Sequence, residues 1–273
     1  MPRRNIPLQS FNAVGAGQTA TVPLSTNLRY HQIYIQYKTN ASQATIETDI
    51  EEIRIKVDGK VQRRFSAVEL NKINAFNGYA FETGMLPIFF SEPWRRSPEG
   101  EDALAWGTAN VGTFDIEIDI ASGATAPKLT GFAVVDDVEA PMVDIVKWYK
   151  RTIPVSATGI HTESNLPKNV DEVYQRLHCF ETAASDISGV DITLESLEAY
   201  NLTDRQNSAL LKNRGFNPQA DVFHVVFDHT QRVSDGYPMM KGDGRQVREF
   251  RLDFDMDQAQ PFTLLTEVRG TPD

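Results

Sequence analysis

Two rows of carboxylates are the residues whose spacing could most directly do chemistry. Six acidic side chains alternate with apolar ones along two stretches: Asp115, Glu117, Asp119, Asp253, Asp255 and Asp257. Every second side chain of a strand points to the same face, about 7 Å from the next. Clustered carboxylate oxygens suit Ca²⁺, so the rows allow a structural calcium site at a subunit boundary. They equally fit the solvated face of an amphipathic strand, and both interpretations stay open.

Other potentially reactive residues form no recognisable catalytic motif. The five histidines include no His-x-His pair and no His-Glu-x-x-His sequence, and the chain has neither a Gly-x-Ser-x-Gly elbow nor a phosphate-binding glycine loop. The odd separation of His224 and His229 across a strand end favours different orientations for the two rings. The single cysteine, Cys179, lies in an apolar stretch, which is typical of a buried, unreactive thiol. We therefore expect a protein that is not an enzyme.

Large apolar side chains in two long loops are candidate interface anchors. The stretches Glu92–Gly112 and Asp228–Val247 lack a sustained period, and loops of this length usually carry function. Aromatic residues and methionines are enriched in the buried centre of interfaces, whereas charged residues stay at the rim. The expected anchors are Trp94, Trp106, Tyr237, Met239 and Met240. The residues of the first loop expected to stay in water are Arg95, Arg96, Glu99, Glu101 and Asp102.

The elements that carry these residues occur twice in the chain. The stretch Glu52–Gly78 predicts two strands joined by an Asp58-Gly59 turn, followed by a helix after the capping box of Ser66 and Glu69. The stretch Val190–Gly215 repeats this pattern. Its capping box begins at Thr203, 137 positions after Ser66. Both helices, expected at 67–77 and 204–214, end at a glycine.

The acidic strands are duplicated as well. Phe114–Ile120 is matched by Phe250–Met256, 136 positions further on, and a proline and a last apolar strand follow each of them. Several features in the same order at a nearly constant offset predict an internal duplication. Short strands with turn signals and no βαβ alternation predict an all-β fold with a few short helices, built as one β-sandwich per half.

Length and composition fit two domains. A chain of 273 residues with 41% hydrophobic residues can fill two cores of ordinary size. We divide it into residues 1–140 and 141–273, with Trp148 in the seam expected to tie the halves together and to act as a further interface anchor. One cysteine excludes an intrachain disulfide, which favours folding in a reducing cytoplasm.

The charge balance argues against nucleic acid as a direct partner. The net charge is −10, from 37 acidic and 27 basic residues, and no basic stripe is present to neutralise phosphates. Short basic clusters such as Arg63-Arg64 are expected at solvated strand ends. No apolar run approaches the ~18 residues of a membrane span, and the N-terminus lacks the apolar core of a secretory signal.

Scattered segments resemble a known family, the double jelly-roll major capsid proteins of the adenovirus, tectivirus and corticovirus lineage. The likeness is closest to the corticovirus major capsid protein and is carried by four segments: 104–108, 113–120, 126–129 and 248–254. The resemblance implies two tandem eight-stranded jelly rolls and a bacteriophage virion protein. It also implies homotrimeric, pseudo-hexameric capsomers that tile an icosahedral shell over an internal membrane, assembled in the host cytoplasm with penton and minor capsid or membrane proteins.

In such a shell the N-terminal arm, residues 1–6, is expected at the inner face. Arg3 and Arg4 would then contact anionic lipid headgroups. The two long loops are expected to form the outward crown of the trimer, with Trp106 as the principal intersubunit anchor.

A different class of protein remains as an alternative. Paired jelly rolls also occur in glycan-cleaving and carbohydrate-binding proteins, which line a cleft with carboxylates and aromatic rings. The three tryptophans, Trp94, Trp106 and Trp148, fit interface anchoring at least as well as sugar stacking. The absence of a secretory signal also disfavours this alternative.

Overall fold

The structure, a computed structural model, describes residues 2–95 and 97–273. These residues form two compact units, which are described one at a time. The first unit spans residues 1–148 and includes the last three residues, 271–273; the second spans residues 149–270.

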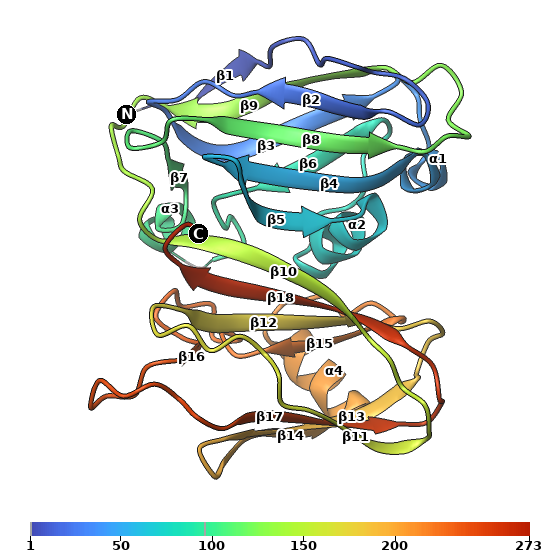
Figure 1. Cartoon of the computed structure of the whole chain (residues 1–273), viewed down its shortest axis with the longest axis vertical. Coiled ribbons are helices and arrows are strands. Elements are labelled where there is room, and N and C mark those ends of the chain that lie inside the picture. The colour runs from blue at the N-terminus through green and yellow to red at the C-terminus, as the bar shows by residue number, and fades with distance from the viewer. Residues whose placement is uncertain (1, 96) are drawn as a thin grey trace. The chain divides into compact units, whose positions relative to one another are not determined.

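The first unit is a sandwich of two sheets with mainly antiparallel strands (Figure 1). One sheet has the strand order β1-β9-β3-β6, and the other has the order β2-β8-β4-β5. The strands are β1 (Arg4–Pro7), β2 (Thr19–Pro23), β3 (Arg29–Tyr37), β4 (Ile50–Val57), β5 (Lys60–Phe65), β6 (Met85–Phe89), β8 (Phe114–Ile120) and β9 (Leu129–Asp136). A short strand, β7 (Trp106–Gly107), pairs with β3. Three helices lie in the connections: α1 (Gln43–Asp49), α2 (Ala67–Phe76) and α3 (Pro98–Asp102).

The second unit has the same architecture. Its sheets have the strand orders β10-β18-β12-β15 and β11-β17-β13-β14. The strands are β10 (Ile145–Ile153, which begins in the first unit), β11 (Gly159–Glu163), β12 (Val173–Phe180), β13 (Ile187–Leu194), β14 (Leu197–Thr203), β15 (Val222–Val226), β17 (Phe250–Met256) and β18 (Phe262–Gly270). A short strand, β16 (Tyr237–Pro238), pairs with β12, and one helix, α4 (Asp204–Asn213), follows β14.

The predicted duplication is confirmed strand by strand. In both units the chain alternates between the two sheets in the order that defines a jelly roll, and each strand from β1 to β9 has a counterpart from β10 to β18. Core contacts repeat as well. The ring centres of Tyr30 and Phe114 lie 5.1 Å apart, edge to face, and those of Tyr174 and Phe250 lie 4.9 Å apart in the same way. The fold is therefore a double jelly roll.

The predicted turn and helix caps are also confirmed. Asp58 and Gly59 both have positive φ angles, 49° and 80°, as a tight two-residue hairpin requires. Complete capping boxes open α2 at Ser66 and α4 at Thr203. Each helix ends one residue earlier than predicted, before a glycine with a φ near 90°. No helix in the described part of the chain is long and apolar enough to cross a membrane.

Strand alternation places one side of each sheet in a core. On β8, Ile116 and Ile118 are fully buried, while the neighbouring Asp115 and Glu117 point outward and are half-buried. In the second unit, Leu252 and Phe254 on β17 pack in a core with Leu177 on β12. Every sheet therefore also has an outward face, and the side chains on these faces and their exposure differ between the two units.

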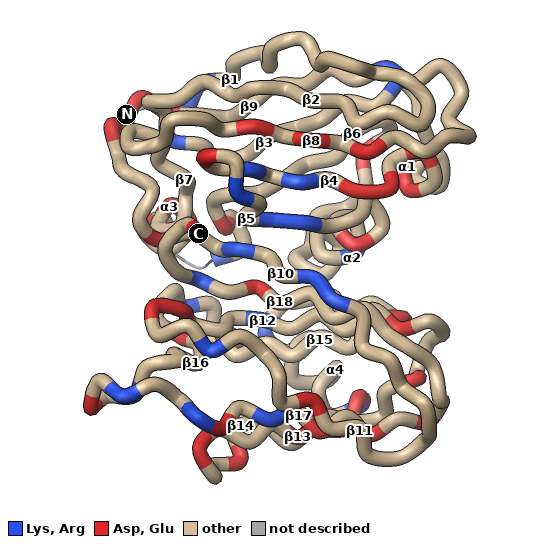
Figure 2. Tube along the Cα trace, viewed as in Figure 1, with Lys and Arg blue, Asp and Glu red and all other residues tan. Residues whose placement is uncertain are grey.

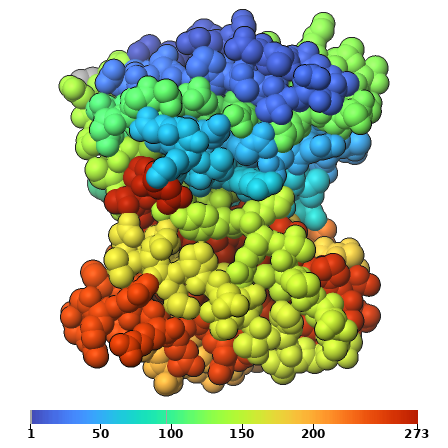
Figure 3. All heavy atoms as spheres, viewed as in Figure 1, coloured from blue at the N-terminus to red at the C-terminus, as the bar shows by residue number. Residues whose placement is uncertain are grey.

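Three features were not expected from the sequence. The stretch between the halves contains two strands, β10 and β11, and the loop after β3 contains helix α1. The chain end returns to the first unit (Figure 3). There the Asp273 amide donates to Gln62 Oε1 at 3.2 Å, and the Asp273 carboxylate accepts from Lys147 Nζ at 2.8 Å.

Candidate assembly surfaces

The first unit buries an arginine within a group of aromatic rings. Arg63 on β5 is 3% exposed. Its guanidinium lies 5.0 Å, 5.1 Å and 5.4 Å from the ring centres of Trp106, Trp148 and Phe90. Nε donates to the Val146 carbonyl at 2.7 Å and Nη1 donates to the Phe89 carbonyl at 2.6 Å. A buried charge needs such partners, so the expectation that Arg63 is solvated is wrong.

Trp106 is a core residue. Its side chain is fully buried, with its ring centre 4.6 Å from that of Phe90 and 5.9 Å from that of Phe114. No surface of this side chain is left for a neighbouring subunit. The structure therefore contradicts the predicted role of Trp106 as an interface anchor, and it does the same for Met239, which is fully buried in the core of the second unit.

The other predicted anchors lie in different environments. Trp148 is buried, with its ring edge against Phe65. Trp94 is half-buried beside Phe89 in the first unit, and Tyr237 is half-buried against Phe227 in the second. Met240 is 47% exposed. For Trp94, Tyr237 and Met240, which keep accessible surface, the role of interface anchor stays a prediction.

The charged residues of the first long loop are less solvated than expected. Arg95 is 6% exposed, and its Nε donates to Glu92 at 2.7 Å, so it does not stay in water. Arg96 lies outside the described residues. Glu99 is exposed, whereas Glu101 and Asp102 are half-buried.

The N-terminal arm is attached to the first unit. Arg3 forms ion pairs with Glu101, at 2.8 Å, and with Asp102, and Arg4 pairs with Asp137 at 2.7 Å. From Arg4 onward the arm is a strand paired with β9; Met1 lies outside the described residues. The arm and the first long loop therefore lie at the same end of this unit. The predictions of an inner arm and an outward first loop cannot both hold.

A second buried charge cluster joins β3 to the end of β9. The Arg29 side chain donates to both carboxylate oxygens of Asp136, with the shortest contact at 2.6 Å, and His31 Nε2 lies 2.8 Å from Asp136 Oδ2. Asp136 is 1% exposed. Burial alone would raise the pKa of Asp136, but hydrogen bonds from Arg29, His31 and the Val138 amide outweigh it and lower the pKa to about 2.

The acidic row of β8 forms ion pairs within the first unit. Figure 2 shows basic residues along β4 beside acidic ones on β8. Arg54 Nη1 lies 2.6 Å from Asp119, and its Nε lies 3.0 Å from Glu117. Lys56 also pairs with Glu117, at 2.8 Å. The hydrogen bond from Arg54 lowers the pKa of Asp119, and that from Lys56 lowers the pKa of Glu117. Of the two interpretations of the acidic rows, the solvated face of an amphipathic strand therefore fits the row on β8.

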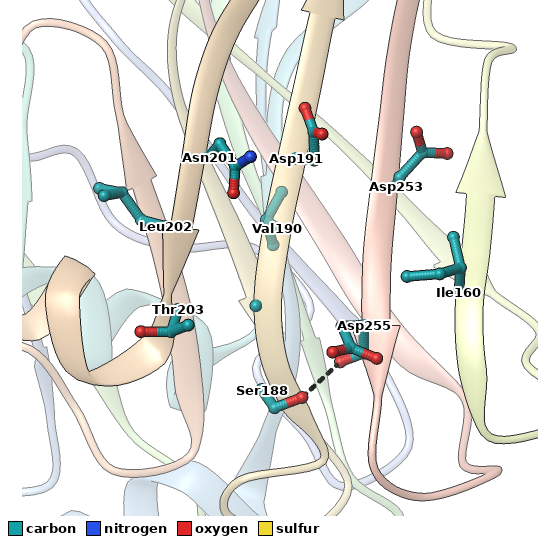
Figure 4. A pocket seen from close by; sticks show the side chains of 10 residues that line it. Ile160, Ser188, Val190, Asp191, Asn201, Leu202, Thr203, Asp253 and Asp255 are labelled. Atoms are coloured by element: carbon teal, nitrogen blue, oxygen red, sulfur yellow. Dashed lines mark hydrogen bonds between the residues drawn. The ribbon is translucent and has the colours of Figure 1, made fainter.

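The acidic row of β17 lines a depression in the second unit (Figure 4). Asp253 and Asp255 face a cavity of about 420 Å³ together with Asp191 and Ile160. Burial, followed by the charges of Glu198 and Asp253, raises the pKa of Asp191. Within residues 2–95 and 97–273, no three His, Cys, Asp or Glu side chains are grouped to hold a metal ion. Calcium at a subunit boundary would need ligands from a second chain, so it stays a prediction.

Sequence reasoning missed a histidine pair on the outward face of the second unit's β12 sheet. His178 Nδ1 lies 2.7 Å from His224 Nδ1, and His178 Nε2 lies 3.1 Å from Glu267 Oε1. All three residues are at most 3% exposed. Only strand pairing, which places His178 directly opposite His224, brings these positions together. On the core side of β12, Cys179 is fully buried, and burial raises the pKa of its thiol well above the usual value, as expected of an unreactive cysteine.

Comparison with known proteins places this fold among viral coat proteins. Residues 5–136 match the family described as viral coat protein P2, N-terminal domain, and residues 145–272 match its C-terminal domain. The two matches span most of the chain. The chain therefore belongs to the P2 family of viral coat proteins, and the protein is a capsid protein of the virion.

Individual relatives agree with this assignment. The chain is 20% identical to the major capsid protein P2 of Pseudoalteromonas phage PM2, over 98% of this chain and 97% of that protein. The crystal structure of phage PM2 P2 gives a TM-score of 0.86 at 18% identity, covering 100% and 98% of the two chains. The STIV major capsid protein gives a TM-score of 0.72 at 11% identity, covering 100% of this chain and 98% of that chain. The PBCV-1 virus capsid gives a TM-score of 0.66 at 10% identity, covering 99% of this chain and 94% of that chain.

The glycan-binding alternative finds no support. The comparisons match major capsid proteins. Trp106 and Trp148, which would have to stack on a sugar, are buried beside Arg63 instead.

Replacing Trp106 should test its assignment to the core. We expect Trp106→Ala to lower the free energy of unfolding by ~3–5 kcal/mol, because it opens a cavity beside a buried arginine, and to yield little soluble protein. Trp106→Phe should lose less, since the ring over Arg63 is kept. Urea unfolding measures both, with Leu197→Ala, at a side chain that is 63% exposed, as the control expected to change stability by under ~0.5 kcal/mol. A stable, soluble Trp106→Ala monomer would contradict the assignment.

The Asp136 cluster should give the protein an acid-sensitive component of stability. The pKa of Asp136 is about 2 in the folded state against an ordinary value of 3.8. The ionised Asp136 carboxylate therefore stabilises the folded state by ~2 kcal/mol above about pH 4, and this stabilisation is lost as the pH falls towards 2. The stability difference between wild type and Asp136→Asn, from urea unfolding at several pH values, should shrink over this range. Asp137→Asn, which alters an exposed pair, is the control; a difference that is independent of pH would refute the assignment.

Proposed function

We propose that this protein forms homotrimeric, pseudo-hexameric capsomers that tile an icosahedral shell. The observation that supports this most is the complete duplication, in which both sheets repeat with the same strand order. Three such chains supply six similar sandwiches, and a ring of six can occupy a hexagonal lattice position. The two repeats are residues 1–140 and 141–273, a division supported by the end of β9 at Asp136 and the start of β10 at Ile145.

The function is structural rather than catalytic. Its partners would be other copies of the chain, penton proteins where the lattice closes, and minor capsid or membrane proteins. Folding and assembly would take place in the host cytoplasm, without direct contact to nucleic acid. The net charge of −10 supports the last point.

A trimer is the central expectation. Size-exclusion chromatography with light scattering on the full chain should give three times the 30.6 kDa mass of one chain. The trimer should persist on dilution, because extensive interfaces between copies dissociate slowly. A monomer at high protein concentration would refute the proposed function.

An inner membrane would be contacted through the N-terminal arm. Arg3 is engaged with Glu101 and Asp102, so Arg4, whose side chain is 51% exposed, is the better probe. We expect Arg4→Glu to weaken binding to vesicles that contain anionic lipid while the trimer stays intact, because each basic residue near such a surface contributes ~1 kcal/mol. Vesicle flotation measures this, with Arg245→Glu, at an exposed position of the second unit, as the control. Equal binding of wild type and Arg4→Glu would eliminate the arm as a lipid contact.

A further inference from the structure

The outward face of the β1-β9-β3-β6 sheet is uncharged across its centre. Inward positions such as Ile33 and Ile35 are fully buried, so the residues between them point outward. Strand register lines up Gln32 with Val134, Tyr34 with Phe132, and Gln36 with Thr130. We call the uncharged sheet face the set Gln32, Tyr34, Gln36, Pro87, Thr130 and Phe132, of which Thr130 is exposed and the others are half-buried.

An aromatic pair lies at the middle of this face. The rings of Tyr34 and Phe132 are stacked, with centres 4.8 Å apart and planes at 10°. Hydrogen bonds hold the polar neighbours: Tyr34 donates to Gln32 at 3.0 Å, and Thr130 donates to Gln36 at 3.1 Å. Aromatic residues without charged neighbours characterise the buried centre of protein interfaces rather than an ordinary solvated surface.

The equivalent face of the second unit is buried. By strand register, the counterparts of Gln32, Tyr34 and Phe132 are Arg176, His178 and Leu265. All three are 0% exposed. The duplicated surface is therefore a buried face in one unit and an accessible one in the other.

The two equivalent helices show the opposite difference. Seven of the ten residues of α2, in the first unit, are buried, including Glu69, Asn71 and Asn74. In α4, of the second unit, only Asn207 and Leu211 are buried. We call the open helix face the exposed residues of α4: Asp204, Arg205, Gln206, Ala209, Lys212 and Asn213. Each chain thus leaves accessible one sheet face and one helix face whose duplicates are buried.

We propose that the uncharged sheet face binds the open helix face of a second copy of this chain. This inference rests on the proposed trimer and names the surfaces that form it. Amide and hydroxyl groups on the sheet face can accept from the Arg205 and Lys212 side chains and pair with Gln206 and Asn213, while Tyr34 and Phe132 form the apolar centre. Because the two surfaces differ, the contact is head to tail, and three repetitions close a ring.

One disruptive substitution on each surface, a charge on the sheet face and a bulky ring on the helix face, tests the proposal. Phe132→Lys should elute at the mass of a monomer, because an unpaired charge would be buried at the centre of the contact. Ala209→Trp, at an exposed helix position, should do the same without touching the core. Thr21→Lys is the matched control: it places the same charge on the outward face of β2, in the other sheet, and should remain a trimer. Thermal unfolding of each variant reports whether it is folded.

Cross-linking tests the pairing directly. The only native cysteine, Cys179, is buried, so introduced cysteines alone should react with a short bismaleimide. The double variant Gln36→Cys/Ala209→Cys should give covalent dimers and trimers, whereas either single variant should not.

The outcomes separate the two proposals. A trimeric wild type in which Phe132→Lys and Ala209→Trp both remain trimeric, or in which the double cysteine variant does not cross-link, overturns this contact and leaves the proposed function in place. Cross-linked dimers from Gln36→Cys alone overturn it in favour of a symmetric contact between two sheet faces. A monomeric wild type refutes both proposals.

Discussion

Each strand of a sandwich has two faces, and only one can point into its core. This chain must therefore accommodate four outward sheet faces, and it does so in four ways. One face carries the ion pairs of Arg54 with Glu117 and Asp119, and one carries the uncharged row around Tyr34 and Phe132. The third is buried with His178 and Glu267, and the fourth lines the acidic depression at Asp253. The core residues determine the fold, whereas the outward residues determine how the protein is used.

Features that depend on neighbouring residues could be predicted from the sequence. The Asp58-Gly59 turn needs positive φ angles, and the capping boxes at Ser66 and Thr203 need only residues three positions apart. Because these signals are local, they could be recognised in both halves. The repeated order then predicted the duplication and one β-sandwich per half, whereas the double jelly roll was implied by the resemblance to the capsid-protein family.

The candidate assembly surfaces were predicted poorly because the burial of a side chain depends on residues far away in the sequence. The charge of Arg63 suggested a solvated residue, yet it shares the inward face of β5 with Phe65, and two carbonyls and three rings surround it. Trp106 lies in a long loop, but the two-residue strand β7 places it opposite Tyr30, within the core. Tyr34 and Phe132 are separated by almost a hundred positions, and only the register of β3 and β9 makes them a pair. No window of sequence contains these relationships.

The two jelly rolls share a backbone plan but not their outward chemistry, and this difference has a physical consequence. If the equivalent faces were identical, each could bind the wrong partner surface with equal affinity, and chains would join in several registers. The first unit's Tyr34 corresponds to the second unit's His178, which is held by His224 and Glu267. The polar, buried α2 corresponds to α4, which keeps Arg205 and Lys212 in water. A charged face and an aromatic one cannot exchange places without leaving charges unpaired. In the proposed trimer, divergence between the repeats would give each equivalent surface a different partner, while the duplicated core keeps the fold of the two units alike.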